Sequence, residues 1–280
     1  MRGQVAVVTG GTSGIGQVAA EQLAGMGARV ILIARSPARA ETTLARLRQA
    51  GPEVDHGAYY ADLSRIAEMR RVSAEIAAAE PRIDVLVNNA GALFNNRQVT
   101  PDGLEMTFAV NHMAYFVVTE GLRERLAAAS AARIINTASG AHNGAKIDFD
   151  DLQFANGYAG FTAYGRSKLA NILFTRELAR RLKGTSITAN CLHPGFVATR
   201  FGDGSGGLLQ ALFPIAKLFA LSPQKGAETI VYLASSPEVA NASGLYYVKR
   251  EPTTPSPEAR DDAAAARLWA ESETILAGAV

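Results

Sequence analysis

The sequence predicts an α/β protein in which helices cover both faces of a parallel, doubly wound sheet. Two observations lead to this fold class. Short, continuously apolar runs alternate with segments of helical periodicity along the chain, and such alternation favours parallel βαβ units. The first apolar run also ends in a glycine-rich turn directly before a helical pattern. We therefore expect right-handed crossovers and a sheet that is buried on both sides.

Seven apolar runs are interpreted as strands. Residues 28–34, Ala-Arg-Val-Ile-Leu-Ile-Ala, are rich in β-branched side chains, which is typical of a parallel strand buried on both faces. The predicted strands are Val5–Thr9, Ala28–Ala34, His56–Ala61, Ile83–Asn88, Arg133–Ala138, Ser186–Leu192 and Gly244–Val248.

Helical patterns separate these strands. Pro37 stands where the second helix begins and Gly51-Pro52 where it ends, which are the usual places for these residues. The predicted helices are Gly14–Gly27, Pro37–Ala50, Ser64–Ala79, Leu104–Ala129, Ala159–Leu182 and Gln224–Ser235.

Two segments fall outside this alternation, although we expect residues 1–280 to form a single domain. Residues 199–222 are first Gly-rich and then apolar, and they follow the carboxyl end of a strand, where ligands bind in such sheets. We expect a substrate lid there, and a loop with one packed helix is the alternative. Residues 251–280 carry three prolines before a helical stretch, so we expect a C-terminal helical extension.

Composition excludes several classes of function. The 28 basic and 26 acidic side chains give a net charge of +2 without a basic block, so no nucleic-acid partner is expected. The single cysteine, Cys191, excludes a disulfide framework, and the four scattered histidines show no metal-ligand spacing. No run approaches the roughly 18 apolar residues of a membrane span. We expect a cytoplasmic protein without a membrane span.

A nucleotide site is predicted between the first strand and the first helix. The turn reads Thr9-Gly10-Gly11-Thr12-Ser13-Gly14-Ile15-Gly16. Glycine permits positive φ and a close approach of phosphate oxygens to the backbone, and the helix N-terminus supplies free N–H groups. A glycine cluster alone is a weak signal, but the strand–turn–helix context makes it a strong one.

The end of the second strand indicates NADP(H) rather than NAD(H). An acid there binds the ribose 2′-hydroxyl in NAD sites, whereas an arginine suits the 2′-phosphate. The sequence has Ala34-Arg35-Ser36, and the first acid after it is Glu41. The planar fork of Arg35 can pair with a phosphate. An ordinary exposed cation is the alternative interpretation of Arg35.

A tyrosine and a lysine share one face of the long helix predicted near residue 164. Tyr164 and Lys168 are four residues apart, so their side chains are neighbours. A nearby ammonium favours the phenolate and lowers the pKa of a tyrosine toward the working range. Tyr164 could then exchange a proton with a carbonyl oxygen, although such a pair also occurs by chance.

Together the motifs resemble those of the short-chain dehydrogenase/reductase family. Thr9-Gly10-x-x-x-Gly14-x-Gly16, Asn88-Asn89-Ala90-Gly91, Asn111, Ser139, Tyr164-x-x-x-Lys168 and Pro194-Gly195 occur in the order and spacing of that family. The resemblance covers about residues 3 to 250 and implies a single Rossmann domain with seven parallel strands.

The resemblance also implies roles for the matching residues. Tyr164 would be the general acid/base, Ser139 would hydrogen-bond the substrate oxygen, and Lys168 would hold the nicotinamide ribose and lower the pKa of the tyrosine. Asn111 would position a water in the proton relay. Residues implied to bind the cofactor are Gly10, Thr12, Ser13, Gly14, Ile15, Gly16, Arg35, Asp62, Leu63, Asn89, Ala90, Gly91, Tyr164, Lys168, Pro194, Gly195, Val197 and Thr199. Asp62 would contact the adenine and Thr199 the carboxamide of the nicotinamide.

A narrower resemblance joins the chain to the retinol dehydrogenase-like subgroup. It rests on Ser139-Gly140-Ala141-His142, on Tyr164-Gly165-Arg166-Ser167-Lys168-Leu169-Ala170-Asn171 and on Leu192-His193-Pro194-Gly195. The resemblance implies NADP(H) and a lipophilic aldehyde, ketone or alcohol as substrate. We expect this chain to lack the N-terminal membrane anchor that many vertebrate members have. Family members often pair through the long helix that carries the tyrosine and form tetramers through the last strand. About 30 residues follow that strand here and could cover its edge, so a homodimer or a monomer is expected.

Alternative functions stay open at this point. The chain could be an NADP-binding regulator without turnover, although a sensor would need only the cofactor half of the motifs. It could also be a family reductase that acts on a C=C or C=N bond. His142 and His193 are expected to form hydrogen bonds near the pocket rather than to take part in the chemistry. Ser139 is not flanked by a Gly-x-Ser-x-Gly elbow, which argues against a hydrolase.

Overall fold

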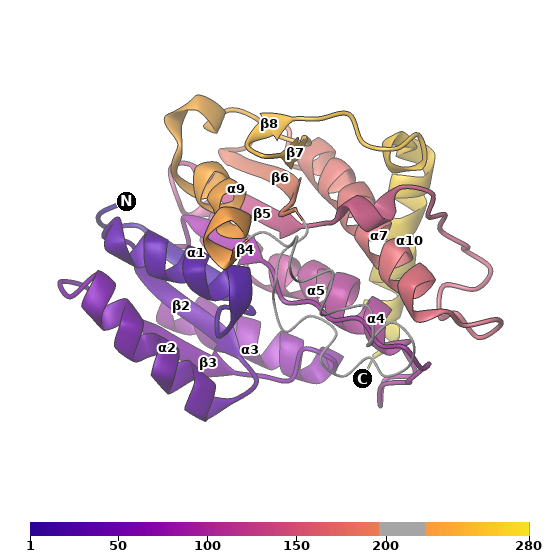
Figure 1. The fold of residues 1–280 in the computed structure, drawn as a ribbon, viewed down its shortest axis with the longest axis horizontal. Coiled ribbons are helices and arrows are strands. Elements are labelled where there is room, and N and C mark those ends of the chain that lie inside the picture. The colour runs from indigo at the N-terminus through magenta and orange to yellow at the C-terminus, as the bar shows by residue number, and fades with distance from the viewer. Residues whose placement is uncertain (196–221, 280) are drawn as a thin grey trace.

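A central sheet of eight strands organises the protein (Figure 1). A computed structural model describes residues 1–195 and 222–279. The strand order is β3-β2-β1-β4-β5-β6-β7-β8; neighbours from β3 to β7 are parallel, and β8 is antiparallel to β7. The strands are β1 (Val5–Thr9), β2 (Arg29–Ala34), β3 (Gly57–Tyr60), β4 (Val85–Asn88), β5 (Ala132–Thr137), β6 (Ile187–His193), β7 (Tyr246–Val248) and β8 (Glu251–Pro252). The predicted doubly wound α/β fold is confirmed.

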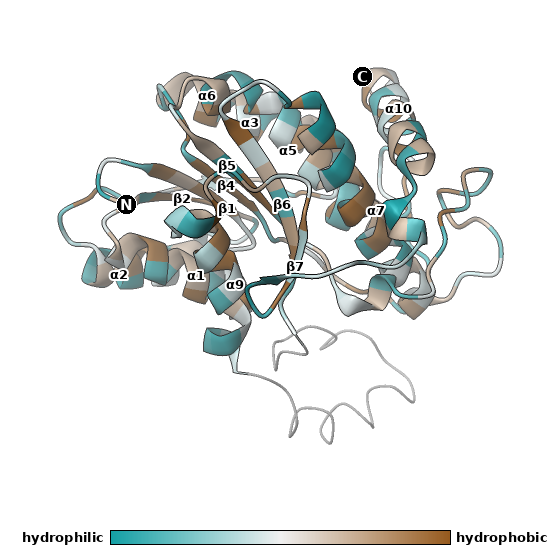
Figure 2. Ribbon diagram, turned by 90° about the horizontal axis from the view of Figure 1, so that it is seen from above, coloured by the Kyte–Doolittle hydropathy of each residue, from teal (hydrophilic) through white to brown (hydrophobic). Residues whose placement is uncertain are grey.

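Helices cover both faces of this sheet, and the strands between them are apolar (Figure 2). On one face lie α1 (Gly14–Gly25), α2 (Pro37–Ala50) and α9 (Pro223–Ser235). On the other lie α3 (Ile66–Ala79), α5 (Ala114–Gly121), α7 (Gly160–Arg181) and α10 (Asp262–Gly278). Strand β1 shows why the run is apolar throughout. Val5 and Val7 pack into one core, whereas Ala6 and Val8 pack into the other, because successive side chains point to opposite faces.

The strand order reverses direction between β1 and β4. β1 pairs with β2 on one side and with β4 on the other. In open α/β sheets, ligands bind outside the carboxyl ends of the strands at such a switch point. The glycine-rich turn follows β1, and Asn89-Ala90-Gly91 follows β4. Both predicted cofactor motifs therefore lie at the switch point.

The prediction of one continuous helix over residues 104–129 is wrong. The segment consists of α4 (Met106–Phe108), a π-helical turn (Ala109–Met113), α5, and, after a break at Leu122, α6 (Arg123–Ala127). A Cβ on Gly121 would lie 2.5 Å from the Cβ of Ser73 in α3. The helix thus ends where α3 packs tightly against it, and this tertiary contact leaves no mark in the helical periodicity.

The C-terminal extension begins with a strand that the sequence analysis did not predict. β8 pairs with the edge of β7 through Val248 and Glu251. Its Pro252 is compatible with an edge strand, because an edge position does not need every backbone N–H. The chain then crosses to the other side of the sheet, and α10 lies along α7 (Figure 1).

The expected lid at residues 199–222 lies outside the described residues, except for Ser222. Within residues 1–195 and 222–279, none of the helices combines the length and the apolar character needed to cross a membrane.

Candidate active site

The turn after β1 brings the backbone unusually close to the loop after β4. Gly10 has φ +66°, and a Cβ there would lie 2.8 Å from the Cα of Ala90. A Cβ on Gly16 would lie 2.3 Å from Nδ2 of Asn89. Contacts this short cannot exist, so only glycine permits this turn. The predicted cofactor residues Thr12, Ser13, Gly14 and Ile15 lie in the same turn and in the start of α1.

The N-terminus of α1 is free to bind an anion. Ser13 is its N-cap residue, but its side chain accepts no hydrogen bond from the helix, and the first turn contains no acidic residue. The first N–H groups of a helix have no partner within the helix, and they carry the positive end of its dipole. A phosphate group would satisfy these donors.

Asn89 and Thr9 fasten the two loops to each other. The hydroxyl of Thr9 accepts the backbone N–H groups of Asn89 and Ala90 at 2.9 and 3.0 Å. Asn89 Nδ2 in turn donates to the carbonyl oxygens of Thr9 and Gly10 at 3.3 and 3.4 Å. These bonds join the loop after β4 to the turn after β1, while the contact of Asn89 with a cofactor stays a prediction.

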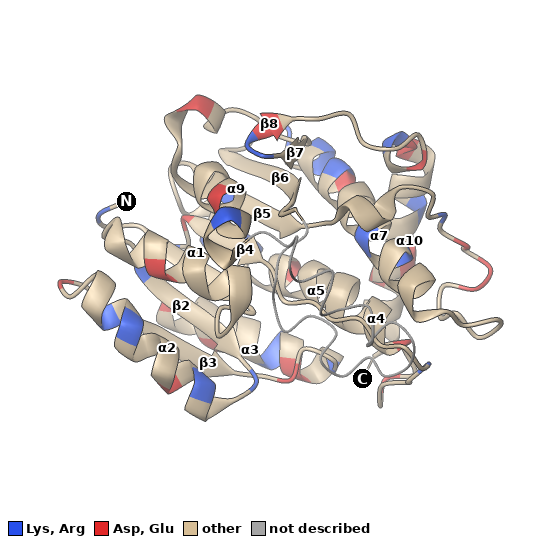
Figure 3. Cartoon of the chain, in the orientation of Figure 1, with Lys and Arg blue, Asp and Glu red and all other residues tan. Residues whose placement is uncertain are grey.

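The carboxyl ends of β2 and β3 carry Arg35 and Asp62. Arg35 is exposed, and none of the described residues forms an ion pair with it. Acidic and basic side chains are interspersed over the rest of the described chain (Figure 3). Asp62 accepts hydrogen bonds from the backbone and the hydroxyl of Ser64 through Oδ1, and Leu63 between them is buried. The position of Asp62 is compatible with the expected adenine contact, and the position of Arg35 with the expected 2′-phosphate contact.

Asn111 lies in the π-helical turn and is fully buried. Its Nδ2 donates to Ala92 O and to Ser167 Oγ, both at 2.9 Å, and its Oδ1 accepts from Ala92 N at 2.8 Å. The amide therefore joins the loop after β4 to the helix that carries Tyr164. Short π-helical turns are frequent at functional sites. The water that Asn111 is expected to position stays a prediction.

Ser139 follows β5 in extended backbone, with φ −163° and ψ 156°. Its Oγ accepts the N–H of Ala141 at 3.2 Å, and its side chain lies close enough to the Tyr164 phenol to lower the pKa of that phenol in part. The structure thus brings together these two residues, which are 25 positions apart in the sequence. A carbonyl oxygen placed between them would accept two hydrogen bonds.

Lys168 completes this group from one turn further along α7. Its Nζ donates to Thr137 O at 3.0 Å and lies 5.5 Å from the centre of the Tyr164 ring. A Cβ on Gly91 would lie 3.3 Å from this ammonium and 3.2 Å from Oδ1 of Asn111. The loop after β4 therefore packs directly against both polar side chains.

Burial governs the ionisation of both groups on α7. It raises the pKa of Tyr164 to about 12, although the hydrogen bond with Ser139 lowers it in part. Burial also lowers the pKa of Lys168 to about 7. The expected lowering of the tyrosine pKa by Lys168 is therefore not found in the protein alone, because desolvation penalises both charged forms. Tyr164 is a protonated phenol at neutral pH.

Comparison with known proteins decides the family. The family described as "short chain dehydrogenase" matches residues 4–205. The chain belongs to the short-chain dehydrogenase family. Human retinol dehydrogenase 13 is 40% identical over 98% of this chain and 85% of its own length. A Streptomyces sp. (strain C5) protein assigned as the daunorubicin C-13 ketoreductase DnrU is 40% identical over 98% of this chain and 93% of its own length.

A solved structure agrees with the fold of this short-chain dehydrogenase. The crystal structure of a short chain dehydrogenase from Burkholderia cenocepacia J2315 in complex with NADP superposes with a TM-score of 0.70. It is 29% identical, and the match covers 88% of this chain and 95% of that one. The glycine cradle, the N-terminus of α1 and Arg35, which has no ion-pair partner among the described residues, fit a nicotinamide dinucleotide.

Two histidines lie beside Ser139, the predicted catalytic serine of this short-chain dehydrogenase. His142 Nδ1 lies 2.7 Å from Ser139 O, and its Nε2 accepts from Ser256 N. His193 Nδ1 accepts the N–H of Gly140 at 3.1 Å. Both form hydrogen bonds near the pocket, as the sequence analysis expected.

Other candidate residues take structural positions or lie outside the described part. Cys191 is buried in β6 and behaves as a small apolar residue. Pro194 and Gly195 follow β6, and Gly195 has φ +86°, whereas Val197 and Thr199 lie outside the described residues. Among residues 1–195 and 222–279, no group of three His, Cys, Asp or Glu side chains is arranged to hold a metal.

Sequence reasoning missed two residues that organise the site. Ser167 Oγ accepts from Asn111 and donates to Tyr164 O at 2.7 Å. Thr137 O accepts both Lys168 Nζ and Asn171 Nδ2. Ser167 could have been noticed because it directly precedes Lys168. Thr137 acts through its backbone carbonyl, which every residue type has, so its identity could not have indicated this role.

Proposed function

We propose that this protein is an NADP(H)-dependent oxidoreductase that interconverts a carbonyl and an alcohol on a lipophilic small molecule. The observation that carries the proposal is the convergence of Lys168 and Asn111 beside Gly91, with Tyr164 and Ser139 next to Lys168. This is a proton-transfer group placed against the loop that borders the nucleotide turn. When bound, the nicotinamide supplies the hydride that carbonyl reduction needs.

The residues of this chain handle the oxygen atom and its proton. The hydroxyls of Ser139 and Tyr164 bind the carbonyl oxygen and orient the substrate. Tyr164 donates its proton as negative charge develops on that oxygen. Its pKa of about 12 keeps the phenol protonated at neutral pH, which suits the reductive direction. In the oxidative direction Tyr164 would accept the proton of the alcohol as a phenolate, a form that a nearby cation favours.

Lys168 and Asn111 serve the return of the proton. Lys168 Nζ donates to Thr137 O and lies near the Tyr164 ring. In this proposal it holds the nicotinamide ribose and passes a proton back toward the phenol. Asn111 is joined to the same helix through Ser167, and in this proposal it holds the water of the relay near Lys168. Ordered hydrogen-bond chains of this kind rely on every buried member having a partner.

The cofactor preference is assigned from Arg35. Its guanidinium is exposed at the end of β2 without an acidic partner in the described chain, and a 2′-phosphate would be a bidentate partner. The complex of the Burkholderia enzyme with NADP is in agreement. The similarity to retinol dehydrogenase 13 and to the ketoreductase supports a lipophilic carbonyl substrate, and the apolar residues 208–219 were expected to face it.

NADPH oxidation with purified protein tests the proposal. We would measure it beside NADH oxidation over aliphatic aldehydes, retinal-like aldehydes, steroid ketones and polycyclic quinones. Tyr164→Phe removes the proton donor and is expected to abolish turnover, while NADPH binding changes less than about 3-fold because the phenol is not needed for affinity. Equal activity in Tyr164→Phe would refute the assigned chemistry.

Product analysis separates the remaining alternatives. An alcohol product supports carbonyl reduction, whereas a saturated or amine product would place the enzyme among the family reductases of C=C or C=N bonds. NADPH binding without turnover on any of these compounds would favour a regulator. We also propose a cytoplasmic location, which the buried, unpaired Cys191 suits.

A further inference from the structure

The C-terminal extension reaches the catalytic serine through a single histidine. Ser256 of the extension donates its backbone N–H to His142 Nε2 at 3.2 Å, across 114 residues of sequence. His142 Nδ1 lies 2.7 Å from Ser139 O. Because Nε2 accepts a hydrogen bond, the ring proton must be on Nδ1, which then donates to the serine carbonyl. His142 is 1% exposed, and both of its nitrogens are committed.

The sequence around Ser256 prepares its N–H for this bond. Pro255 and Pro257 flank it, so Ser256 has the single N–H of this tripeptide. Proline fixes its own φ, and it also restricts the residue before it. The donor is therefore held in place at little further cost in conformational entropy. The ring of His142 also packs edge-to-face on Tyr246 of β7 at 5.1 Å.

The hydrogen bonds around Ser139 leave its hydroxyl proton free for the substrate side. His142 holds the carbonyl of Ser139, and the N–H of Ala141 holds its Oγ at 3.2 Å. Because Oγ accepts one hydrogen bond from Ala141, its own hydroxyl proton stays available as a donor. The position of this hydroxyl thus depends on the histidine.

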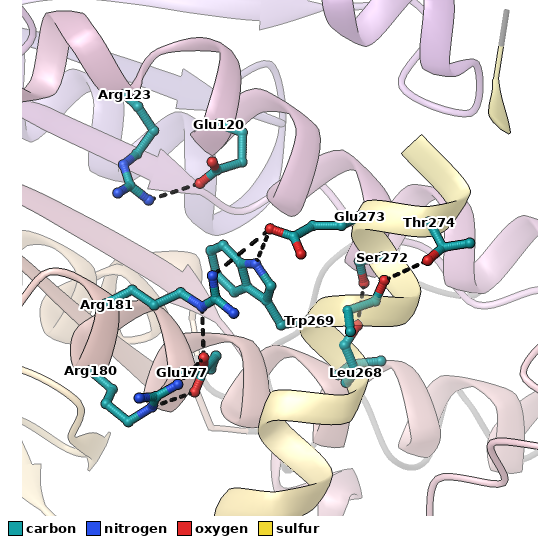
Figure 4. Close-up of polar contacts among 11 residues, drawn as sticks. Glu120, Arg123, Glu177, Arg180, Arg181, Leu268, Trp269, Ser272, Glu273 and Thr274 are labelled. Carbon is teal, nitrogen blue, oxygen red and sulfur yellow. Dashed lines mark hydrogen bonds and ion pairs between the residues drawn. The ribbon is translucent and has the colours of Figure 1, made fainter. Parts of the chain in front are cut away.

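A second contact anchors the same extension beside Asn111. Ser272 of α10 lies 2.9 Å from Nε2 of the buried His112, and His112 is the neighbour of Asn111 in the π-helical turn. Trp269 fixes α10 on this face, with its ring 5.0 Å from Phe116 and 5.7 Å from Phe174. Figure 4 shows Trp269, Ser272 and Glu273 on the side of α10 that faces Arg181 of α7.

We propose that the C-terminal extension, residues 251–279, is a positioning element of the active site that acts on Ser139 through His142. The inference rests on the proposed function, since Ser139 is a catalytic residue only there. The groups around His142 are His193 of β6, Tyr246 of β7 and Glu258 of the extension. None of them uses the two ring nitrogens, so among the described residues the hydrogen-bonded link between Ser256 and Ser139 runs through His142.

A double-mutant cycle tests this link. Ser256→Pro removes the N–H donor, and His142→Asn keeps a polar group near the Nδ1 position but has no atom at Nε2. Each change is expected to lower kcat about 10- to 100-fold through misplacement of Ser139, with the NADPH dissociation constant unchanged. Because both remove the same bond, the double variant is expected to be no slower than the slower single variant.

Matched comparisons separate positioning from damage to the fold. Thr254→Pro introduces a proline two residues away at an exposed position whose N–H has no recorded partner in the described chain, and it is expected to keep the kcat of the wild type. His142→Gln, which can reach the Nε2 position, is expected to recover part of the rate lost in His142→Asn. The proposal would be overturned if the fold loss of kcat in the double variant equalled the product of the two single losses. Unchanged kcat in both single variants would also overturn it.

The tautomer of His142 gives a readout that needs no turnover. Nitrogen NMR of the wild type at pH 7 is expected to show a neutral ring protonated on Nδ1, and the signal is expected to change in Ser256→Pro. A charged ring or an Nε2–H tautomer would overturn the proposal. If the tautomer is as expected but no substrate is turned over, the proposed function has failed and the structural link has not.

Discussion

The nucleotide side of the site, residues 9–16 with Arg35, adjoins the catalytic side, which comprises Asn111, Ser139, Tyr164 and Lys168. The first is a matter of backbone: glycines permit a turn that side chains would obstruct, and its residues are close in sequence. The second is a matter of side chains from separate elements, of which Asn111 and Lys168 are buried and each hydrogen-bonded to another part of the chain. The nucleotide side tolerates no added volume, whereas the catalytic side tolerates no lost partner.

The largest effect is expected when the packing of α10 behind the catalytic side is disrupted. Trp269→Ala removes the ring that packs between Phe116 and Phe174 and should lower the free energy of unfolding by about 3–5 kcal/mol. Urea unfolding measures it, with Phe161→Ala as control, because Phe161 is 61% exposed. Loss of α10 from α7 would also expose an apolar face, so size-exclusion chromatography is expected to show association. A loss below about 1 kcal/mol would contradict this role of α10.

The next effect concerns the nucleotide side. Gly16→Ala places a methyl group 2.3 Å from Asn89 Nδ2 and 2.5 Å from Gly10 O, so the turn must open. We expect NADPH binding to weaken by about 100-fold or more, which is about 2.7 kcal/mol. Gly25→Ala in the same helix is the matched control, because its nearest atom is Ala50 O at 3.7 Å. Equal affinities in the two variants, measured by calorimetry, would show that the turn does not hold the cofactor.

A smaller change is expected at the rim of the nucleotide side. Arg35→Asp replaces a phosphate partner with a like charge and offers an acceptor to a 2′-hydroxyl. The preference for NADPH over NADH is expected to fall by about 30- to 100-fold, in keeping with the 1.5–3 kcal/mol of charged hydrogen bonds. Arg48→Asp, at the far end of α2, is the control. An unchanged ratio of dissociation constants would place recognition of the 2′-phosphate elsewhere.

The smallest expected effect is that stability depends on pH through His112, next to Asn111 on the catalytic side. The nucleotide side contains no histidine, so it is not expected to contribute to this pH dependence. Burial lowers the pKa of His112 to about 3 from 6.5. Its neutral form therefore stabilises the fold fully above pH 6.5, and this contribution is lost as the pH falls toward 3. At pH 5 the loss is about 2 kcal/mol. Urea unfolding at pH 7.5 and pH 5 should show a steeper loss for the wild type than for His112→Gln. Identical losses would contradict the assignment.

Local patterns determined most of the scaffold and the nucleotide side. The periodicity of apolar residues predicted the seven parallel strands, and the glycines after β1 and the Arg35 after β2 have the required positions because the motif is continuous in sequence. The same reasoning assigned Ser139, Tyr164 and Lys168 from their resemblance to family motifs, and the structure brings these three side chains together.

Tertiary structure alone decided what surrounds these groups. The break at Leu122 depends on the approach of α3, and β8 forms because an edge of β7 is available. The pKa of Tyr164 rises because of burial, which depends on what packs around it rather than on the lysine four residues away. His142 and His112 receive their partners from serines 114 and 160 residues distant. A polar group and the partner that satisfies it need not be close in sequence, so no short pattern predicts them.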